Sequence, residues 1–305
     1  MNKSNVIFIM GPTASGKTEL AMQLYDQMDC DLISVDSALV YRGMDIGTAK
    51  PSPAELQRYP HHLINVCEPD EPYSVSRFRD DCLTLIERAF EHNKQPVLVG
   101  GTMLYFKTLM QGIADLPMAD EAVRKAINEE AQQSGWQALH QQLAEYDPTS
   151  AERIKPADSQ RIQRAVEVYR ITGKTLTEYF AEQENTALKY PIKSFALAPL
   201  ERAVLRQRIR VRFESMLEAG LVEEVKNLIE TKGFDTDLPA LRSVGYRQVV
   251  MYISGEYDYD LMIEKAVTAT SRLAKRQMTW LRSWPEVTWL ETGSKSNTNK
   301  LISNL

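Results

Sequence analysis

The sequence predicts an α/β protein in which a parallel sheet is flanked by helices and interrupted by an all-helical segment. Short apolar runs alternate with helical patterns over residues 6–101, residues 120–183 show helical periodicity only, and an apolar run returns after them. The alternation is typical of βαβ units, whose strands pair in parallel and are covered by helices on both faces.

The predicted strands are short apolar runs, and the predicted helices carry apolar residues at helical spacing. The strands cover residues 6–10, 32–35, 63–66, 96–99, 195–198 and 287–290. The helices outside the all-helical segment cover residues 18–28, 76–92, 201–219, 221–232 and 259–282. Residues 1–115 and 189–305 are therefore expected to form the α/β core, and residues 116–188 a helical insertion. The polar tail at residues 293–304 is expected to be frayed.

The composition is that of a globular protein, because 43% of the 305 residues are hydrophobic and 25% are charged. The net charge of −5 argues mildly against nucleic-acid binding, although basic residues cluster locally, as at residues 202–212 and 272–282. The three cysteines form no C-x-x-C pair, which argues against a disulfide framework or a zinc site. The sequence has no signal-peptide pattern, membrane-length apolar run or coiled-coil seam, so we expect a cytoplasmic monomer without a membrane partner.

A phosphate-binding motif follows the first predicted strand and opens the next helix. The match to G-x-x-x-x-G-K-[ST] comprises Gly11, Pro12, Thr13, Ala14, Ser15, Gly16, Lys17 and Thr18. In such a P-loop, backbone amides and the helix dipole bind phosphate oxygens, Lys17 supplies a charge, and the Thr18 hydroxyl can ligate Mg²⁺. The predicted fold is therefore a P-loop NTPase-like sheet with an inserted helical domain. The motif alone predicts ATP or nucleotide binding as readily as any other phosphate ligand, and a glycine-rich turn without a ligand is the alternative.

Two further turns are expected at the same edge of the sheet. Asp36 follows the second strand and Gly100-Gly101-Thr102 follows a later one, and ligands of open α/β sheets bind beyond the carboxyl ends of the strands. Asp36 can accept a proton from a nucleophile or help to hold a metal ion. The alternatives are a capping or turn aspartate and a plain tight turn.

Arg208 and Arg212 lie four residues apart on a predicted helix, beside the apolar positions Leu205 and Ile209. We expect one of the two arginines to reach a bound diphosphate. An exposed cationic helix face is the alternative.

Several segments, in order from about residue 5 to 290, carry a more specific pattern than the P-loop alone. They are residues 11–18, 36–51, 100–105, 244–248 and 275–282. These segments resemble the bacterial tRNA dimethylallyltransferase (tRNA isopentenyltransferase) family, and the stretch from Asp36 to Pro51 is the most specific of them.

The resemblance implies transfer of a dimethylallyl group from dimethylallyl diphosphate to N6 of the adenosine next to the anticodon of certain tRNAs. It implies Mg²⁺ as cofactor, an insertion that grips the anticodon arm, Asp36 as general base, and Thr102 at the reaction channel. Lys17 would join Asp36 and Thr102 as a catalytic residue. The tRNA contacts implied are Asp36, Ser37, Ala38, Leu39, Thr102, Arg124, Gln160, Arg161, Ile162, Gln163, Arg164, Arg242, Ser243, Val244, Gly245, Tyr246, Arg247, Lys275, Arg276, Gln277, Met278, Thr279, Trp280, Leu281 and Arg282.

The chemistry is physically reasonable for these residues. An exocyclic adenine amine is a weak nucleophile that needs a base, and a departing diphosphate needs cations and amides. Arg161 and Arg164 share a helix face and are expected to hold RNA phosphates, whereas Trp280 and Trp284 are expected to pack rather than to stack on bases. A small-molecule kinase, a transferase that prenylates free adenine nucleotides, and a nucleotide-dependent module without chemistry remain alternatives.

Overall fold

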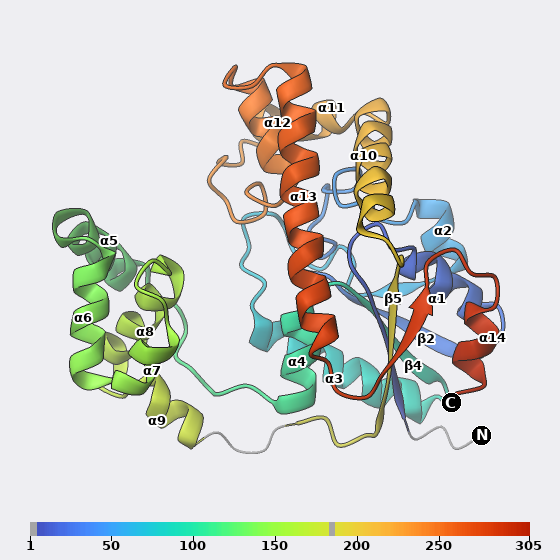
Figure 1. Ribbon diagram of the computed structural model, residues 1–305, viewed down its shortest axis with the longest axis horizontal. Coiled ribbons are helices and arrows are strands. Elements are labelled where there is room, and N and C mark those ends of the chain that lie inside the picture. Colours follow the sequence, from blue (N-terminus) through green and yellow to red (C-terminus); the bar gives the residue numbers. More distant parts are fainter. Residues whose placement is uncertain (1–4, 183–186) are drawn as a thin grey trace. The chain divides into compact units, whose positions relative to one another are not determined.

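The computed structural model describes residues 5–182 and 187–305, and within them six strands form one parallel sheet (Figure 1). The strand order is β3-β2-β4-β1-β5-β6, and every pairing is parallel. The strands are β1 (Val6–Met10), β2 (Cys30–Val35), β3 (His61–His62), β4 (Gln95–Gly100), β5 (Ile192–Ala198) and β6 (Val287–Glu291). The predicted α/β fold is confirmed.

The central strand β1 is buried on both faces, which explains its unbroken apolar sequence. Ile7 and Ile9 join an apolar cluster that includes Leu24 of helix α1 (Lys17–Tyr25) and Leu301 of helix α14 (Asn297–Ile302). Phe8 points to the other face and meets the ring of Phe106 in helix α4 (Met103–Gln111) at a centroid distance of 4.9 Å. Alternate residues of one strand therefore hold helices on both sides of the sheet.

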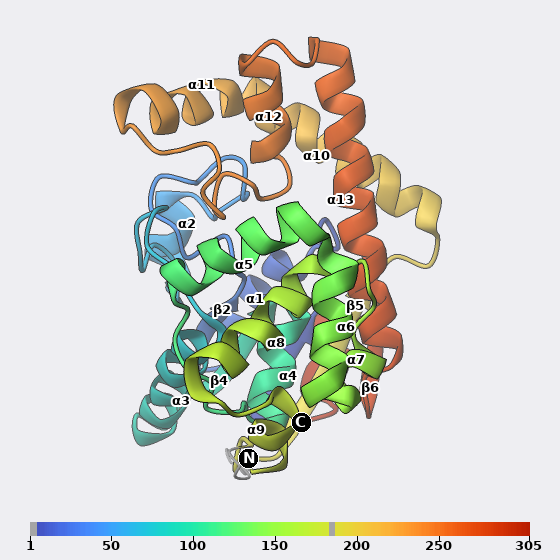
Figure 2. The ribbon, with the colours of Figure 1, turned by 90° about the vertical axis from the view of Figure 1, so that its left-hand side faces the viewer.

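Helices of the α/β unit precede and follow the insertion in the sequence. They are α1 (Lys17–Tyr25), α2 (Pro53–Arg58), α3 (Val75–Glu91), α4 (Met103–Gln111), α10 (Arg202–Glu218), α11 (Leu221–Lys226), α12 (Tyr246–Ile253), α13 (Tyr259–Arg282) and α14 (Asn297–Ile302). Figures 1 and 2 show α13 running beside α10 and α12, and contacts between residues of these helices agree. A turn of π-helix, Asn227–Thr231, continues α11, so the predicted helix at residues 221–232 changes its winding midway.

Two expectations about this unit were wrong. The strand predicted at residues 63–66 does not form, because Leu63 and Asn65 have φ angles of 61° and 56°. Left-handed backbone breaks an extended strand, and the pairing is limited to His61–His62. The tail at residues 293–304 is not frayed: it forms α14, whose Leu301 is fully buried and whose Thr298 hydroxyl donates to Gln23 of α1.

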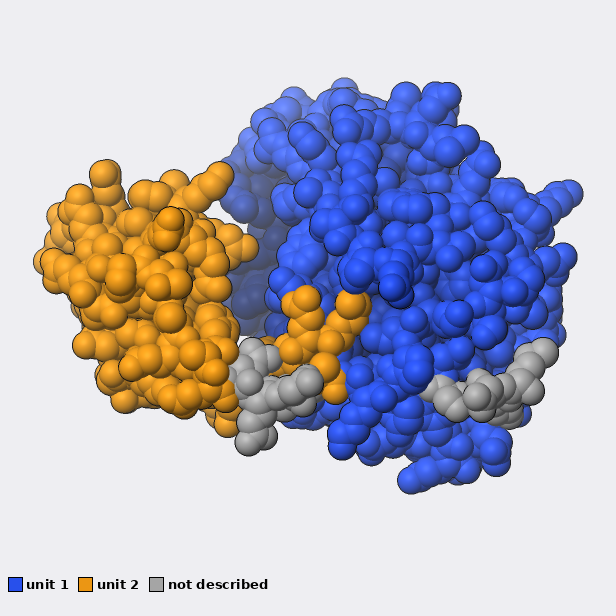
Figure 3. Space-filling model, turned by 60° about the horizontal axis from the view of Figure 1, so that its bottom comes forward, with its two compact units in different colours: residues 1–109, 188–305 blue, residues 110–187 orange. Residues whose placement is uncertain are grey.

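The chain divides into two compact units, residues 1–109 with 188–305 and residues 110–187, which Figure 3 shows in different colours. The second unit contains α5 (Glu121–Ser134), α6 (Trp136–Tyr146), α7 (Pro148–Arg153), α8 (Ser159–Thr172) and α9 (Leu176–Ala181). Side-chain caps begin most of these helices: Asp120, Asp147, Asp158 and Thr175 each accept a hydrogen bond from a backbone amide three residues later. A separate apolar cluster that includes Ile127, Leu139 and Ile162 forms its core.

None of the helices in the described part of the chain combines the length and hydrophobicity needed to cross a lipid bilayer.

Candidate functional site

The loop at residues 11–18 joins β1 to α1 through positions that require glycine. A Cβ atom on Gly11 would lie 2.5 Å from the carbonyl oxygen of Leu197 in β5, and Gly16 has a φ of 91°. Helix α1 begins at Lys17 without a side-chain cap, so the positive end of its dipole faces the loop. The loop thus has the geometry with which backbone amides bind phosphate.

Lys17 is a cation in a desolvated setting at this loop. Its Nζ atom donates to the carbonyl oxygen of Pro12 at 3.2 Å. The pKa of Lys17 is lowered to about 8, mainly by desolvation; the charge of Asp36 opposes this shift and the charge of Arg212 adds to it. An anionic ligand would relieve this cost, because it would favour the charged ammonium group.

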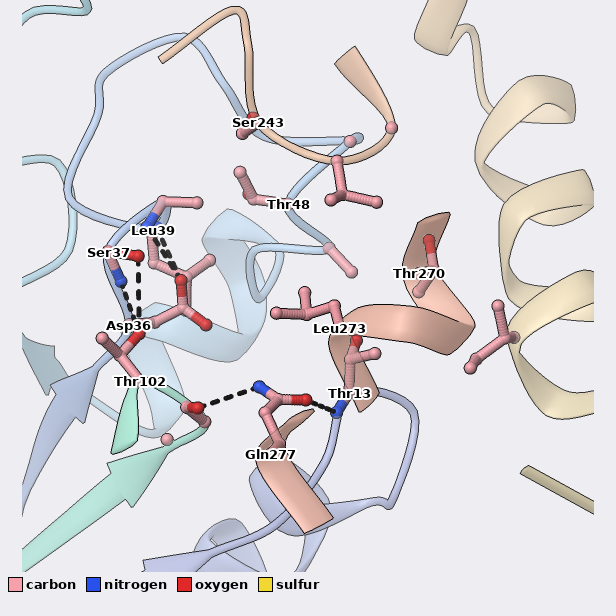
Figure 4. Close-up of a pocket in the computed structure, with 18 of the residues that line it drawn as sticks. Thr13, Asp36, Ser37, Leu39, Thr48, Thr102, Ser243, Thr270, Leu273 and Gln277 are labelled. Carbon is pink, nitrogen blue, oxygen red and sulfur yellow. Dashed lines mark hydrogen bonds between the residues drawn. The ribbon is translucent and has the colours of Figure 1, made fainter. Parts of the chain in front are cut away.

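Asp36 and Thr102 lie at the ends of neighbouring strands, β2 and β4. One carboxylate oxygen of Asp36 accepts hydrogen bonds from the amides of Ala38 (2.8 Å) and Leu39 (3.4 Å). The Thr102 hydroxyl accepts from the amide of Ser37 at 3.1 Å, and the Thr102 amide donates to the carbonyl of Val35 at 3.2 Å. Figure 4 shows Asp36 and Thr102 side by side. Asp36 therefore has a turn role through Oδ1, and its other oxygen, Oδ2, lies outside that turn.

The two arginines predicted near the diphosphate both contact this region, in different ways. Arg208 donates from Nε to the carbonyl of Ala14 in the loop at 2.9 Å. Arg212 donates from Nη2 to the carbonyl of Thr48 at 3.3 Å and lines the cavity beside Lys17 and Asp36. Its Nε atom is buried without a hydrogen-bond partner among the described residues. Desolvation lowers the pKa of Arg212, and the charge of Asp36 partly opposes this shift. The desolvation means that Arg212 does not lie on an exposed cationic face.

Lys17, Asp36, Thr102 and Arg212 line a cavity of about 500 Å³. Figure 4 shows part of its wall, including Asp36 and Thr102. Apolar side chains, including Leu104, Phe213, Met216 and Leu273, share its wall with the charged ones. The predicted site residues that line it are Thr13, Lys17, Thr18, Asp36, Ser37, Ala38, Leu39, Thr102, Arg212, Ser243, Val244, Gly245, Tyr246, Arg276, Gln277 and Trp280. A mixed wall of this kind suits a ligand with an anionic end and an apolar end.

Comparison with known proteins decides the family. The IPP transferase family model matches residues 39–284. The chain belongs to the IPP transferase family. It is similar to a tRNA isopentenylpyrophosphate transferase of Bacillus halodurans, with 34% identity, a TM-score of 0.71, and coverage of 99% of this chain and 94% of that one. A tRNA Δ(2)-isopentenylpyrophosphate transferase of Staphylococcus epidermidis matches with 32% identity, a TM-score of 0.70, and coverage of 98% and 97%.

A eukaryotic dimethylallyltransferase acting on tRNA has 27% identity and a TM-score of 0.81, over 99% of this chain and 80% of that one. The resemblance to tRNA dimethylallyltransferases is thus confirmed, and as a member of the IPP transferase family the chain is an enzyme.

Some residues for which the family resemblance implies tRNA contact have buried side chains. Ile162 and Leu281 are fully buried in their units, and Tyr246 is 1% exposed. Ile162 and Leu281 can therefore meet RNA only through their backbone or by holding neighbours in place. By contrast, the side chains of Lys275, Arg276, Thr279 and Arg282 in α13 are exposed, as are Arg242 and Arg247.

In the helical unit, three predicted arginines differ in what they contact. Arg124 and Arg164 each donate at 2.8 Å to the carboxylate of Glu167, which is fully buried. Arg164 also donates to the carbonyl of Pro117 at 2.6 Å. Arg161 pairs with Asp158, and its side chain is 73% exposed. Of the three, Arg161 is the most accessible to a phosphate group.

The side-chain amide of Gln277, one of the residues implied to contact tRNA, forms hydrogen bonds within the protein. Its Oε1 atom accepts from the amide of Thr13 at 2.9 Å, and its Nε2 atom donates to the carbonyl of Gly101 at 2.8 Å. It thereby joins the loop at residues 11–18 to the turn after β4 (Figure 4). Sequence reasoning missed this role, because nothing local to α13 indicates which loops its side chains reach.

The implied Mg²⁺ can be tested against the donor atoms present. Thr18 and Asp36 both line the cavity, and a hydroxyl and a carboxylate are oxygen donors of the kind Mg²⁺ prefers. In the described part of the chain no group of three His, Cys, Asp or Glu residues is placed to hold a metal ion. The site therefore fits an ion that takes most of its ligands from substrate phosphates and water, as Mg²⁺ does.

Proposed function

We propose that this enzyme transfers a dimethylallyl group from dimethylallyl diphosphate to N6 of the adenosine adjacent to the anticodon in tRNA. The observation that carries the proposal is the convergence of Lys17, Arg212 and Asp36 on one cavity with apolar walls. The two cations suit a diphosphate, the apolar wall suits a five-carbon prenyl group, and the carboxylate suits an amine that must lose a proton. The tRNA relatives support the choice of acceptor.

In the proposed reaction N6 forms a bond to C1 of the dimethylallyl group as the bond from C1 to the diphosphate oxygen breaks. Asp36 accepts the proton that N6 loses. General-base catalysis of this kind raises the rate by a factor of about 10² to 10⁴. Lys17, Arg212 and the loop amides stabilise the negative charge on the departing diphosphate. Arg208 donates a hydrogen bond to the carbonyl of Ala14 and so supports the loop at residues 11–18. Bound Mg²⁺, held by Thr18 and the phosphate oxygens, would supply further charge neutralisation.

RNA binding is assigned to exposed cationic side chains of the helical unit and of α13. We propose that residues 116–188, with Arg161 as their most exposed predicted contact, bind the anticodon arm. The exposed cations of α13, Lys275, Arg276 and Arg282, would bind phosphates near the reacting base, which must leave its stack to enter the cavity.

The test is a transfer assay with purified enzyme, labelled dimethylallyl diphosphate, Mg²⁺ and either tRNA or AMP as acceptor. After digestion of the tRNA, the label should be found on N6 of the adenosine next to the anticodon. Label on AMP with none on tRNA would instead assign the protein to prenylation of free nucleotides. Absence of transfer to either acceptor would contradict the proposal.

A further inference from the structure

Glu224 of α11 accepts hydrogen bonds from three consecutive backbone amides of the loop at residues 45–47. Its Oε2 atom accepts from Asp45 (2.9 Å) and Ile46 (2.7 Å), and its Oε1 atom accepts from Gly47 (3.1 Å). The hydroxyl of Tyr246 donates to Oε1 at 2.5 Å. Consecutive amides form a concave array that binds anions, and here a side chain of α11 supplies the anion.

This loop forms part of the wall of the cavity. Gly47 and Thr48 line the cavity, and the carbonyl of Thr48 accepts the hydrogen bond from Arg212. The loop also packs tightly against Tyr246, because a Cβ atom on Gly47 would lie 2.5 Å from the Tyr246 ring. Glu224 and Tyr246 thus anchor the loop directly before Thr48, and the carbonyl of Thr48 is a hydrogen-bond partner of the Arg212 guanidinium.

Glu224 itself does not line the cavity, so it is not placed to touch a substrate. We infer that Glu224 is a positioning residue, which sets Arg212 for the diphosphate by fixing the loop at residues 45–48. The inference rests on the proposed function for the identity of the diphosphate. It predicts that loss of the hydrogen bonds from residues 45–47 to Glu224 weakens the use of dimethylallyl diphosphate far more than the binding of tRNA.

Glu224→Gln tests this with little change of side-chain volume. The amide nitrogen of a glutamine would face backbone N–H groups and repel them, so the loop should lose part of its anchor. We expect kcat/KM for dimethylallyl diphosphate to fall about 10- to 100-fold, the effect of misplacing one substrate-holding group, with the Kd for tRNA within about threefold. Glu223→Gln is the matched control, because Glu223 is the neighbouring acid and its side chain is 74% exposed.

A merely structural role would lower the amount of folded enzyme and reduce kcat/KM for both substrates together. The double variant with Arg212→Lys separates the two roles. If Glu224 acts through Arg212, Glu224→Gln should cause much less than its single-variant loss when Arg212 is already replaced. Fully additive losses would contradict the inference. Tyr246→Phe, which removes one donor and keeps the ring, should give a smaller loss of the same kind if Glu224→Gln does not fold.

Calorimetry with inorganic diphosphate keeps the result independent of the proposed reaction. Wild-type enzyme that fails to prenylate tRNA would contradict the proposed function, whereas Glu224→Gln with wild-type diphosphate affinity would contradict the role of Glu224. Hydrogen exchange at the amides of residues 45–47 should rise in Glu224→Gln and stay unchanged in Glu223→Gln.

Discussion

The side chain of Gln277 accepts a hydrogen bond from the backbone amide of Thr13, across 264 residues of sequence. The same side chain donates to the carbonyl of Gly101, the residue before Thr102. One amide of α13 therefore fixes the distance between the phosphate loop and the turn that carries Thr102. Because exposed cations of α13 lie on either side of Gln277 in the sequence, this helix links the proposed RNA-binding surface to the proposed diphosphate site.

Gln277→Glu should damage the diphosphate site more than RNA binding. A carboxylate can still accept from Thr13 but cannot donate to Gly101, and it adds a negative charge beside the leaving group. We expect kcat/KM for dimethylallyl diphosphate to fall about tenfold or more, with tRNA affinity nearly unchanged. The measurement is steady-state kinetics with a filter-binding assay for tRNA, and Gln207→Glu on the exposed face of α10 is the control. Weaker tRNA binding with normal diphosphate kinetics would show that Gln277 contacts RNA.

Asp36→Asn should remove the proposed general base and keep the turn. An asparagine oxygen can accept from Ala38 and Leu39 as Asp36 does, so the fold should be preserved. We expect kcat to fall by about 10² or more while tRNA affinity stays within a few fold. Single-turnover rates at saturating tRNA provide the measurement, and Asp29→Asn at an exposed position is the control. Near-normal turnover would rule out Asp36 as the base.

Arg161 and Arg164 should behave differently when each is replaced by alanine. Arg161 is exposed, so its loss should weaken tRNA binding and reduce the slope of log K against log salt by about one, with no change in the melting temperature. Arg164 holds Glu167 and Pro117, so its loss should first destabilise the helical unit. Salt titrations and thermal melts of both variants make the comparison. An unchanged salt slope in Arg161→Ala would mean that this face does not bind RNA.

The helical unit should lose stability in acid through Glu167. Burial alone would raise the pKa of Glu167, but hydrogen bonds from Arg124 and Arg164 outweigh it and hold the pKa below its ordinary value of 4.5. Near its pKa, Glu167 therefore binds fewer protons in the native state than in the unfolded state. The stability that ionised Glu167 contributes is complete above pH 4.5 and is lost as the pH falls through the lowered pKa.

Glu167→Gln should lower stability at neutral pH by about 1 to 3 kcal/mol, because it leaves two guanidinium groups without their charged acceptor. It should also flatten the dependence of unfolding on pH below 4.5. Hydrogen exchange of peptides from residues 110–187 between acid and neutral pH measures both effects. A variant as acid-sensitive as the wild type would place the titration on another carboxylate.

Much of the α/β core could be predicted from sequence, because each of its strands and turns has a local sequence pattern. Val6–Met10 is uniformly apolar since β1 is covered on both faces. Gly11 is required by the close approach of Leu197, and Gly16 by its positive φ. The strand predicted at residues 63–66 was wrong because Leu63 and Asn65 adopt left-handed backbone conformations, which hydrophobicity does not report. The tail was predicted to fray because its polar residues conceal the burial of Leu301.

The site was predictable to the extent that its groups end strands. Asp36 and Thr102 follow β2 and β4, and both line the cavity with Lys17. Glu224 and the amide contacts of Gln277 could not be predicted, because each joins segments more than 170 residues apart and neither partner carries a local signal. Such contacts follow from how α11 and α13 pack, which a single sequence does not state.

The most direct test of the account is a turnover assay with tRNA, dimethylallyl diphosphate and Mg²⁺ in which ATP is omitted. A P-loop is shared with enzymes that consume ATP, but a diphosphate ester offers the same array of oxygens to the loop at residues 11–18. We predict one diphosphate released per prenylated tRNA, inhibition by added ATP at most, and near-complete loss of turnover in Lys17→Ala. An absolute requirement for ATP with stoichiometric formation of ADP would contradict the account.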